Sequence, residues 1–428
     1  MSDSISKAKI NKTGESIRNC LLNNQIVSNE DLSNLQLYRT SFKDPLNKAN
    51  EELNRIMKKI DKSGVITYRV KRIESIFSKL IRFEKMDLAR MHDIAGARCI
   101  VLNEKKVRAF VNEIQKSQIL EVKDVDDYIT NPKETGYKSI HLRCVCEGKF
   151  IEVQVRDETQ HSWATLVEIT DVIYKTKIKE NRDDKNTGLY EFLQLFSKSK
   201  NLTLEERKKI NEVLFKTKFI QRVTNTFCKN AIILRNNWCK KKIPKGQFYV
   251  FEVDKKNNPN ISVYDNFIKA EEKYFSSFTK DMDIQETNYV MAYISNDDFE
   301  MISKAYSNYV LIKHNFYMNL SNILRNDSSD KKTNSDSFAL LDLCNNCQTY
   351  VHVSELNMLV KMIPSKNKKY EEWMNYIHKE VYNTSKLPSV KYETYKVPKK
   401  FNFYTFKTVV KISFLIFKIK KLSKKIKK

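Results

Sequence analysis

Apolar residues recur at helical spacing in three segments of the first third of the chain. In residues 46–60, 73–80 and 107–114 every third or fourth residue is apolar, which is the period of an amphipathic helix. The largely apolar run at 97–102, interrupted only by Arg98, predicts a buried strand between the second and third of these helices. The pattern therefore indicates a domain that mixes helices with at least one strand.

Strict alternation of apolar and polar residues takes over in the stretches KSIHLRCVC and KFIEVQVRD, on either side of Glu147-Gly148. This pattern predicts an antiparallel hairpin with a two-residue turn and one apolar face. The other face carries the polar residues His141, Arg143, Glu152, Gln154 and Arg156. The turn length sets two cross-strand pairs, Arg143 with Glu152 and His141 with Gln154. A charged sheet face beside a covered one is typical of an active-site floor.

The sequence divides into five segments when composition is added to the pattern. The later part combines a charged helix, LTLEERKKINEVLF, with the strand-like runs FYVFEV and NYVMAYI, and a stretch without apolar residues, DSSDKKTNSDS, marks a linker. The segments are an N-terminal extension at 1–44, a domain at 45–200, an α+β extension at 201–326, a linker at 327–338 and a basic region at 339–428. We predict an α+β fold, with a mixed or antiparallel sheet flanked by helices and an additional α+β C-terminal region.

The charge balance points to a polyanionic partner. The chain has 77 Lys and Arg against 52 Asp and Glu, a net charge of +25. Such an excess favours nucleotides, RNA or an acidic membrane surface. Compositional drift toward lysine, with no selected partner, is the competing interpretation, because the chain has only 7 Gly. The cysteines lack disulfide-scaffold spacing and the polar start MSDSISKAKI has no secretory leader, so we expect a cytoplasmic protein.

The segment at 45–200 contains the residue types that pyrophosphate transfer from ATP requires. That reaction needs carboxylates for a divalent metal, cations for the triphosphate and a group near the attacking hydroxyl. Four ordered blocks, RVKRIESIFSKLIR, MHDIAGARCIV, DYITNPKETGYKSIH and IEVQVRDETQHSWA, resemble the RelA/SpoT family of alarmone synthetases. The resemblance implies a nucleotidyltransferase-like synthetase domain, a GTP pyrophosphokinase that transfers pyrophosphate from ATP to the ribose 3′ hydroxyl of GTP or GDP and produces (p)ppGpp.

The same resemblance implies roles for individual residues. Asp93 would bind Mg²⁺, for which Mn²⁺ can substitute, and Glu152 would bind the metal and activate the acceptor hydroxyl as the catalytic residue. The residues implied for ATP are Arg69, Lys71, Lys79, Arg82 and Arg98. Those implied for the acceptor nucleotide are Lys133, Tyr137 and His141, with Gln154 and Arg156 as support for the polar face. Without the shared spacing, solvated helix charges, a capping aspartate and a loop-anchoring tyrosine would explain the same residues.

Departures from the family pattern leave the acceptor open. Thr135, Asp157 and Ile169 stand where the family often has asparagine, threonine and histidine. The stretches QHSWATLVEI, FYVFEV and ISKAYSNYV look like a branch with a C-terminal extension. One alternative is a toxin that pyrophosphorylates the 3′ end of tRNA and blocks translation, and another is a degenerate domain that only binds nucleotide. No histidine precedes His92, which predicts synthesis without the family's hydrolase domain.

The C-terminal region offers two weaker signals. Cys344 and Cys347 form a CxxC motif followed by His352, but a zinc site needs a fourth ligand, so we expect no zinc there. The final stretch, FNFYTFKTVVKISFLIFKIKKLSKKIKK, interleaves apolar residues with lysines. It fits an interfacial helix on an anionic membrane, an RNA-binding tail or a packed helix with a frayed basic end. The pattern does not indicate an oligomeric state.

Overall fold

The computed structural model describes residues 5–71, 73–174, 176, 178, 188–198, 202–224, 248–253, 259–264, 269, 273, 288–293, 316–325, 340–341 and 343–344. The chain divides into two compact units. The first consists of Met1–Pro132, Lys138–His161 and Pro244–Met301, and the second of Lys133–Tyr137, Ser162–Ile243 and Ile302–Lys428. The segment bounds predicted from the sequence stay predictions.

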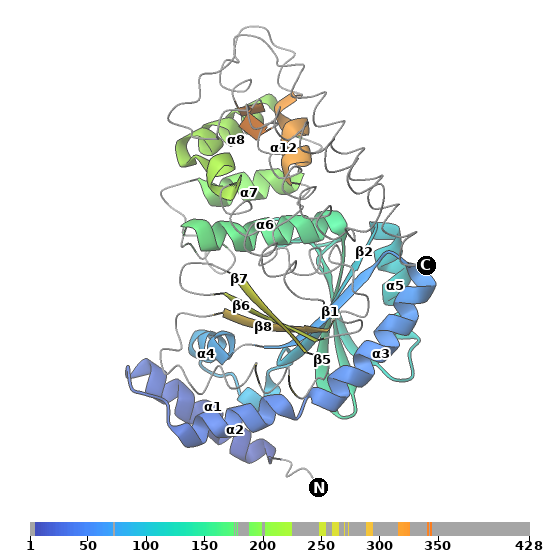
Figure 1. Cartoon of the computed structure of the whole chain (residues 1–428), viewed down its shortest axis with the longest axis vertical. Helices are drawn as coiled ribbons and strands as arrows, with labels where there is room; N and C mark the ends of the chain where they lie inside the picture. Colours follow the sequence, from blue (N-terminus) through green and yellow to red (C-terminus); the bar gives the residue numbers. More distant parts are fainter. Residues whose placement is uncertain are drawn as a thin grey trace, which may run out of the picture. The chain divides into compact units, whose positions relative to one another are not determined.

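A five-stranded mixed sheet forms the centre of the first unit, in the order β1-β2-β5-β4-β3 (Figure 1). Its strands are β1 (Val65–Val70), β2 (Ala95–Val101), β3 (Glu121–Asp127), β4 (Ile140–Cys146) and β5 (Lys149–Asp157). Strands β2 and β5 run parallel, whereas the other neighbouring pairs are antiparallel. The predicted α+β class with a mixed sheet is confirmed.

The β4–β5 hairpin has the predicted turn and register. Glu147 and Gly148 both have positive φ, 48° and 73°, as a two-residue turn of this kind requires. Both predicted cross-strand pairs form. The apolar face lies in the core, with side chains no more than 1% exposed at Ile140, Leu142, Cys144, Cys146, Ile151, Val153 and Val155. Alternation therefore identified which face of the hairpin lies in the core.

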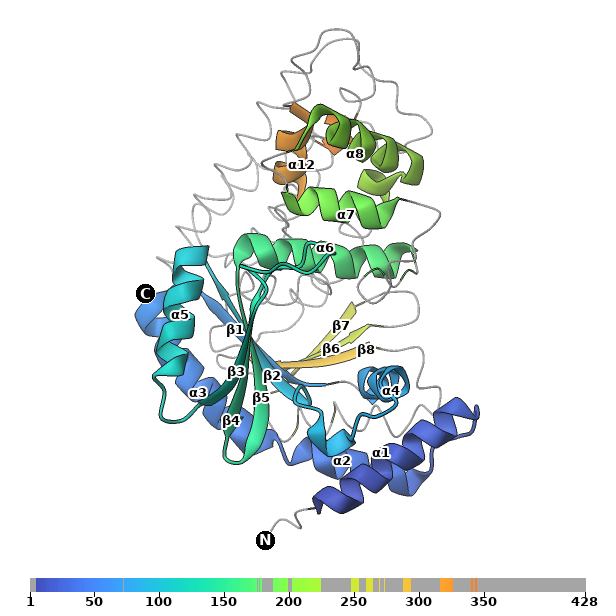
Figure 2. The ribbon, with the colours of Figure 1, turned by 180° about the vertical axis from the view of Figure 1, so that it is seen from behind.

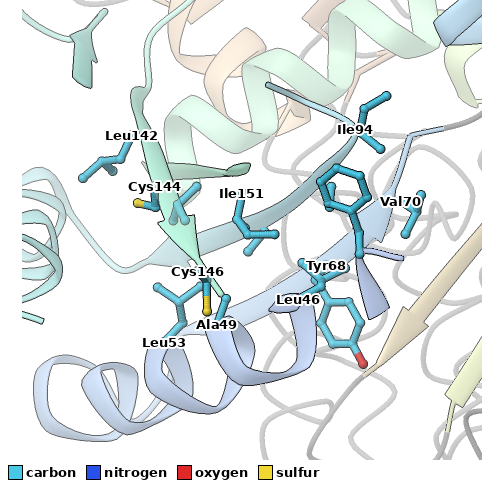
Figure 3. Packing of buried hydrophobic residues seen from close by; sticks show 14 of the residues in the cluster. Leu46, Ala49, Leu53, Tyr68, Val70, Ile94, Leu142, Cys144, Cys146 and Ile151 are labelled. Atoms are coloured by element: carbon cyan, nitrogen blue, oxygen red, sulfur yellow. The ribbon is translucent and has the colours of Figure 1, made fainter. Parts of the chain in front are cut away.

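Helices α3 (Lys43–Ile60) and α5 (Glu104–Gln115) cover the apolar face of the sheet. Both match predicted helices. Figure 3 shows Leu46, Ala49 and Leu53 of α3 on the side of the helix that faces the hairpin residues Cys144 and Cys146. Helices cover the apolar face of the sheet. The charged side chains therefore lie on the other face.

Two helices lie in the segment predicted as a polar extension. They are α1 (Lys7–Leu22) and α2 (Asn29–Thr40), and Ser6 and Ser28 cap their N-termini. Helix α1 packs against α2, α4 (Ile73–Arg82) and the short 3-10 helix η1 (Leu88–Arg90). Figure 2 shows α1 and α2 side by side. The sequence pattern missed them because part of their buried surface is polar.

A second, three-stranded sheet also belongs to the first unit. It consists of β6 (Phe248–Val253), β7 (Pro259–Tyr264) and β8 (Asn288–Tyr293), in the order β7-β6-β8. Strands β6 and β8 coincide with the predicted strand-like runs, and β7 was not predicted. Strand β8 packs near β1 of the larger sheet.

Apart from the loop Lys133–Tyr137, the described part of the second unit is mainly helical. Its helices are α6 (Glu158–Tyr174), whose first turn belongs to the first unit, α7 (Leu189–Lys198), α8 (Leu204–Thr217) and α12 (Phe316–Arg325). Helix α8 is the predicted charged helix. We predicted that α6 packs under the hairpin sheet, but Trp163, Leu166 and Val167 instead belong to the core of the second unit. Large aromatic side chains from α7 and α12 complete that core, including Phe192 and Phe316.

Several predictions fall outside the described residues. They are the linker at 327–338, the ISKAYSNYV stretch, Cys347, His352 and the basic tail. Cys344 is described and buried, and its Sγ lies 3.4 Å from the carbonyl oxygen of Tyr317. Among the described helices, none has the length and apolar character needed to cross a membrane.

Candidate active site

Strand register builds two rows of polar side chains across the exposed face of the larger sheet. Side chains at paired positions of adjacent strands point to the same face. The first row contains Arg69, Gly96, Glu152 and Arg143, from β1, β2, β5 and β4. The second row contains Thr67, Arg98, Gln154 and His141 on the same strands. Of the predicted site residues, the two rows contain five, and Arg156, the next residue of β5 on this face, is the sixth.

Glu152 is the most strongly held carboxylate of this face. Its Oε1 lies 3.2 Å from Nδ1 of His141, and its Oε2 accepts a hydrogen bond of 2.9 Å from Nε2 of Gln154. Burial raises the pKa of Glu152, but the hydrogen bond and charge of His141, the Gln154 bond and the charge of Lys71 outweigh it, and the pKa falls to about 2. Glu152 is therefore ionised at neutral pH.

Gln154 and Arg156 support Glu152 in series. Nη2 of the buried Arg156 donates to Oε1 of Gln154 at 3.0 Å, and this contact orients the amide so that its nitrogen faces Glu152. The oxygen and nitrogen of the amide are thus both used. This chain of donors limits the carboxylate to a single orientation.

Asp93 is the second carboxylate of the site, and two lysines bind it. Its Oδ2 lies 2.7 Å from Nζ of Lys71, and its Oδ1 lies 2.9 Å from Nζ of Lys79. The antiparallel pairing of β1 and β2 explains the first contact, because Lys71 follows the end of β1 and Asp93 precedes the start of β2. A backbone hydrogen bond of 2.6 Å from Lys71 to Ile94 closes this strand end.

Several charged groups surround Asp93 and Lys71. Burial raises the pKa of Asp93, but Lys71 and then Lys79 outweigh that effect and hold it below its usual range. Burial lowers the pKa of Lys71, Asp93 opposes this, and the charges of Lys79 and Arg69 add to the lowering. The group has more cations than carboxylates. A bound polyphosphate would relieve the repulsion among these cations.

Lys71 connects the two carboxylates electrostatically. Its charge also contributes to the low pKa of Glu152, so one ammonium group acts on both Asp93 and Glu152. The described residues hold no cluster of three or more His, Cys, Asp or Glu side chains that could form an all-protein metal cage. Mg²⁺ commonly takes one or two carboxylates and completes its shell with water and substrate phosphates, and two ionised carboxylates fit that donor set.

The other residues predicted to bind ATP are Arg69, Arg82 and Arg98. Arg69 is exposed on β1, and Arg98 is half-buried on β2. Arg82 is exposed at the end of α4, with its guanidinium carbon 4.8 Å from the centroid of the Phe83 ring. The structure therefore brings Lys71 and Lys79 together at Asp93 and leaves Arg69 and Arg82 facing solvent.

The residues predicted for the acceptor separate into two groups. His141 contacts Glu152 and lies edge-on to Tyr128, with ring centroids 5.2 Å apart. Lys133 and Tyr137 belong to the second unit, where Nζ of Lys133 lies 5.6 Å from the centroid of the Tyr137 ring. Their role in acceptor binding stays a prediction.

Three contacts of the polar face were not foreseen. Arg143 forms ion pairs with Asp124 and, at 3.1 Å, with Asp126, both on the edge strand β3. His92 stacks on the ring of Phe150, with centroids 4.1 Å apart. The ion pairs of Arg143 had a signal in the sequence, because Asp124 and Asp126 alternate along the chain and would point to the same face of a strand. The sequence pattern did not indicate strand β3, so this signal was missed.

Gly96 leaves bare backbone beside Glu152, so we expect Gly96→Ala to disturb the site. An added Cβ would lie 2.8 Å from the main-chain oxygen of Glu152, which cannot rotate away. The strands must separate, and we expect a loss of about 1–3 kcal/mol in unfolding free energy. Denaturant unfolding and activity measurements check this. Gly148→Ala is the control, because it strains a turn with no atom near the new Cβ and should leave activity of the folded protein unchanged.

A sequence profile described as "Region found in RelA / SpoT proteins" matches residues 68–179. The chain carries a RelA/SpoT domain. This domain is similar to the probable GTP diphosphokinase RSH3, chloroplastic, of Arabidopsis thaliana, with 34% identity over 115 residues, 26% of this chain and 16% of the plant protein. It is also similar to GTP pyrophosphokinase YwaC of Bacillus subtilis, with 33% identity over 111 residues, 23% of this chain and 53% of that protein.

Among solved structures, the small alarmone synthetase 2 from Bacillus subtilis is similar at 27% identity and a TM-score of 0.32, over 38% of this chain and 89% of that one. The resemblance inferred from the four sequence blocks is confirmed by the profile match. The match spans about a sixth of the plant protein and about half of YwaC. The RelA/SpoT domain contains both carboxylates and both of their lysines, whereas α1 and α2 precede it.

Proposed function

We propose that this protein transfers pyrophosphate from ATP to the ribose 3′ hydroxyl of GTP or GDP and so produces (p)ppGpp. The RelA/SpoT domain and relatives named GTP diphosphokinase and GTP pyrophosphokinase support this activity. The observation that carries the proposal is a pair of ionised carboxylates: Asp93, which Lys71 and Lys79 bind directly, and Glu152, whose pKa the charge of Lys71 also lowers.

The donor side would use the cations of the site. Lys71 and Lys79 both bind Asp93. A triphosphate carries more negative charge than one carboxylate, so both lysines would shift toward it, and one oxygen or both of Asp93 would become free. Arg69 and Arg98 would contact the adenine, since a guanidinium plane stacks well on a base. Arg82 would reach the outer phosphates.

The metal would be Mg²⁺, with Mn²⁺ as a substitute, held by Asp93 and Glu152. When bound, it would neutralise charge that develops on the transferred phosphates. The pKa of about 2 limits what Glu152 itself can do, because so weak a base takes little of the hydroxyl proton before the bond to phosphorus forms. Pyrophosphoryl transfer through a loose transition state needs little base catalysis. Glu152 would therefore orient the hydroxyl and hold charge.

A test of the activity incubates the full chain with γ-labelled ATP and, in separate reactions, GDP, GTP or bulk tRNA. We expect label in the guanosine product together with an equal amount of AMP. Glu152→Gln serves as the inactive control. Label in tRNA alone would overturn GTP or GDP as the acceptor, and label in neither, with wild type and Glu152→Gln alike, would overturn transfer altogether.

The tRNA arm is included because one observation favours it. A net charge of +25 exceeds what a nucleotide substrate requires, whereas RNA binding draws on many cationic contacts with phosphates. In this second candidate function the donor chemistry is unchanged, and the acceptor is the hydroxyl of the terminal adenosine of tRNA. Salt dependence separates the two, because transfer to tRNA should fall steeply with ionic strength and transfer to GDP should not.

A further inference from the structure

The two lysines proposed to bind the donor phosphates lie in a long excursion between two adjacent strands. Strands β1 and β2 are antiparallel neighbours, yet residues 71–94 separate them, and this segment contains Lys71, Lys79 and Asp93. Antiparallel neighbours are commonly joined by two to five residues. An excursion of this length is not held in place by the sheet, so other elements must fix its course.

Arg39 of α2 fixes the start of the excursion. Its side chain is fully buried, and its Nε donates a hydrogen bond of 3.0 Å to the main-chain oxygen of Lys71. Nη1 donates to Oε1 of Gln36 on the same helix at 2.8 Å. The amide of Lys71 bonds Ile94 on its other side. The main chain of Lys71 is thus held both by the sheet and by α2.

Arg18 and Asn11 of α1 fix the later part. Nε of Arg18 donates to the main-chain oxygen of Leu80 at 2.9 Å, and its Nη2 bonds the oxygen of Met86. Leu80 follows Lys79 directly, so this contact caps the turn of α4 that carries the second lysine. Oδ1 of Asn11 accepts a hydrogen bond of 2.9 Å from the amide of Ala89.

A glycine allows this close approach. A Cβ added at Gly14 of α1 would lie 2.6 Å from the Cβ of Leu88 in η1, and no rotamer change of Leu88 moves that atom. Helix α1 and the excursion are therefore in direct contact at a point where a side chain does not fit. The contacts made by α1 and α2 follow one another along the excursion from residue 71 to residue 89.

We propose that α1 and α2 form a positioning clamp for the donor-phosphate lysines, in which Arg39 sets the main chain of Lys71 and Arg18 sets the turn that carries Lys79. This inference rests on the proposed function for what the lysines bind. Both arginines act through other residues and touch no substrate. Small displacements of a binding group cost large factors in rate, so loosening the clamp should weaken ATP use while acceptor use is retained.

The experiment compares the full-length wild type with Arg39→Lys, Arg18→Met and Gly14→Ala. Arg39→Lys keeps the charge but loses the guanidinium donors, and Gly14→Ala acts without removing any charge. We expect the dissociation constant and KM for ATP to rise by about tenfold in each variant, with KM for GDP within about twofold of wild type. Arg55→Met, which breaks an ion pair between α3 residues away from the excursion, and Glu15→Ala, on the exposed face of α1, are the controls.

Hydrogen exchange of the nucleotide-free chain tests the clamp independently of activity. Peptides that cover residues 71–90 should exchange faster in the three variants, whereas peptides from α5 should not change. If wild type binds no ATP, the proposed function fails, and the exchange data still decide whether the clamp exists. If wild type binds ATP and the three variants match it in both ATP affinity and exchange, the clamp is overturned. It is also overturned if the variants lose only as much thermal stability as Arg55→Met and differ from that control in neither ATP affinity nor exchange.

Discussion

Asp93→Asn is expected to abolish pyrophosphate transfer while it preserves ATP binding. The substitution keeps the shape of the side chain but removes the charge that would hold the metal, so we expect the turnover number to fall by about 10³-fold. Initial rates of AMP release measure this. In buffer with a chelator, ATP affinity should equal or exceed that of wild type, because Lys71 and Lys79 no longer have a carboxylate partner.

This pair of outcomes separates a metal ligand from a structural ion pair. Lys71→Met should show the opposite pattern, with weak ATP binding even under chelation. Asp61→Asn is the matched control, since Asp61 is a buried aspartate bound to Lys106 at 3.0 Å on another part of the first unit. It should lower stability without changing transfer by the folded protein. Full activity in Asp93→Asn would rule out its assignment as a metal ligand.

The hairpin and the helices α3, α4 and α5 that precede it could be predicted because their periods are strong. In β4 and in the middle of β5, from Ile151 to Val155, every second residue is buried, so the pattern predicts the turn, the register and the core face. In strand β1 every residue except Arg69 is buried. The strand is therefore covered on both faces and shows no alternation of buried and exposed residues. Strand β3 is an edge strand that is mostly half-exposed. Neither therefore gave a periodic signal.

The candidate site likewise contains contacts that the sequence could predict and contacts that it could not. Hairpin register could be predicted, and it places Arg143 opposite Glu152 and His141 opposite Gln154. The cross-strand side-chain contact of Glu152 is instead with His141, on the diagonal, which register alone did not indicate. The contact of Lys71 with Asp93 depends on β1 pairing with β2, and without β1 the sequence resemblance was what indicated these residues. The clamp could not be predicted, because α1 and α2 bury polar residues such as Asn34 and Arg39 where a hydrophobic pattern expects apolar ones.

Glu152→Gln is expected to reduce transfer by at least about 10²-fold while ATP affinity stays within about twofold. The amide has the same shape but lacks the charge that would bind the metal and orient the acceptor hydroxyl. Single-turnover rates and ATP titrations measure the two quantities. Glu52→Gln is a suitable control, because Glu52 is also a buried carboxylate whose pKa is lowered by Arg55, but it lies on α3.

The pH dependence adds a second test of the same carboxylate. The pKa of Glu152 is about 2 in the folded chain, against a higher value when unfolded, so its ionisation stabilises the fold above the unfolded pKa and this contribution is lost as pH falls toward 2. The difference in unfolding free energy between wild type and Glu152→Gln should thus be largest near neutral pH and shrink below about pH 5. A stability difference that already shrank between pH 7 and 5 would contradict this low pKa, since a group with that value has no proton to gain in that range.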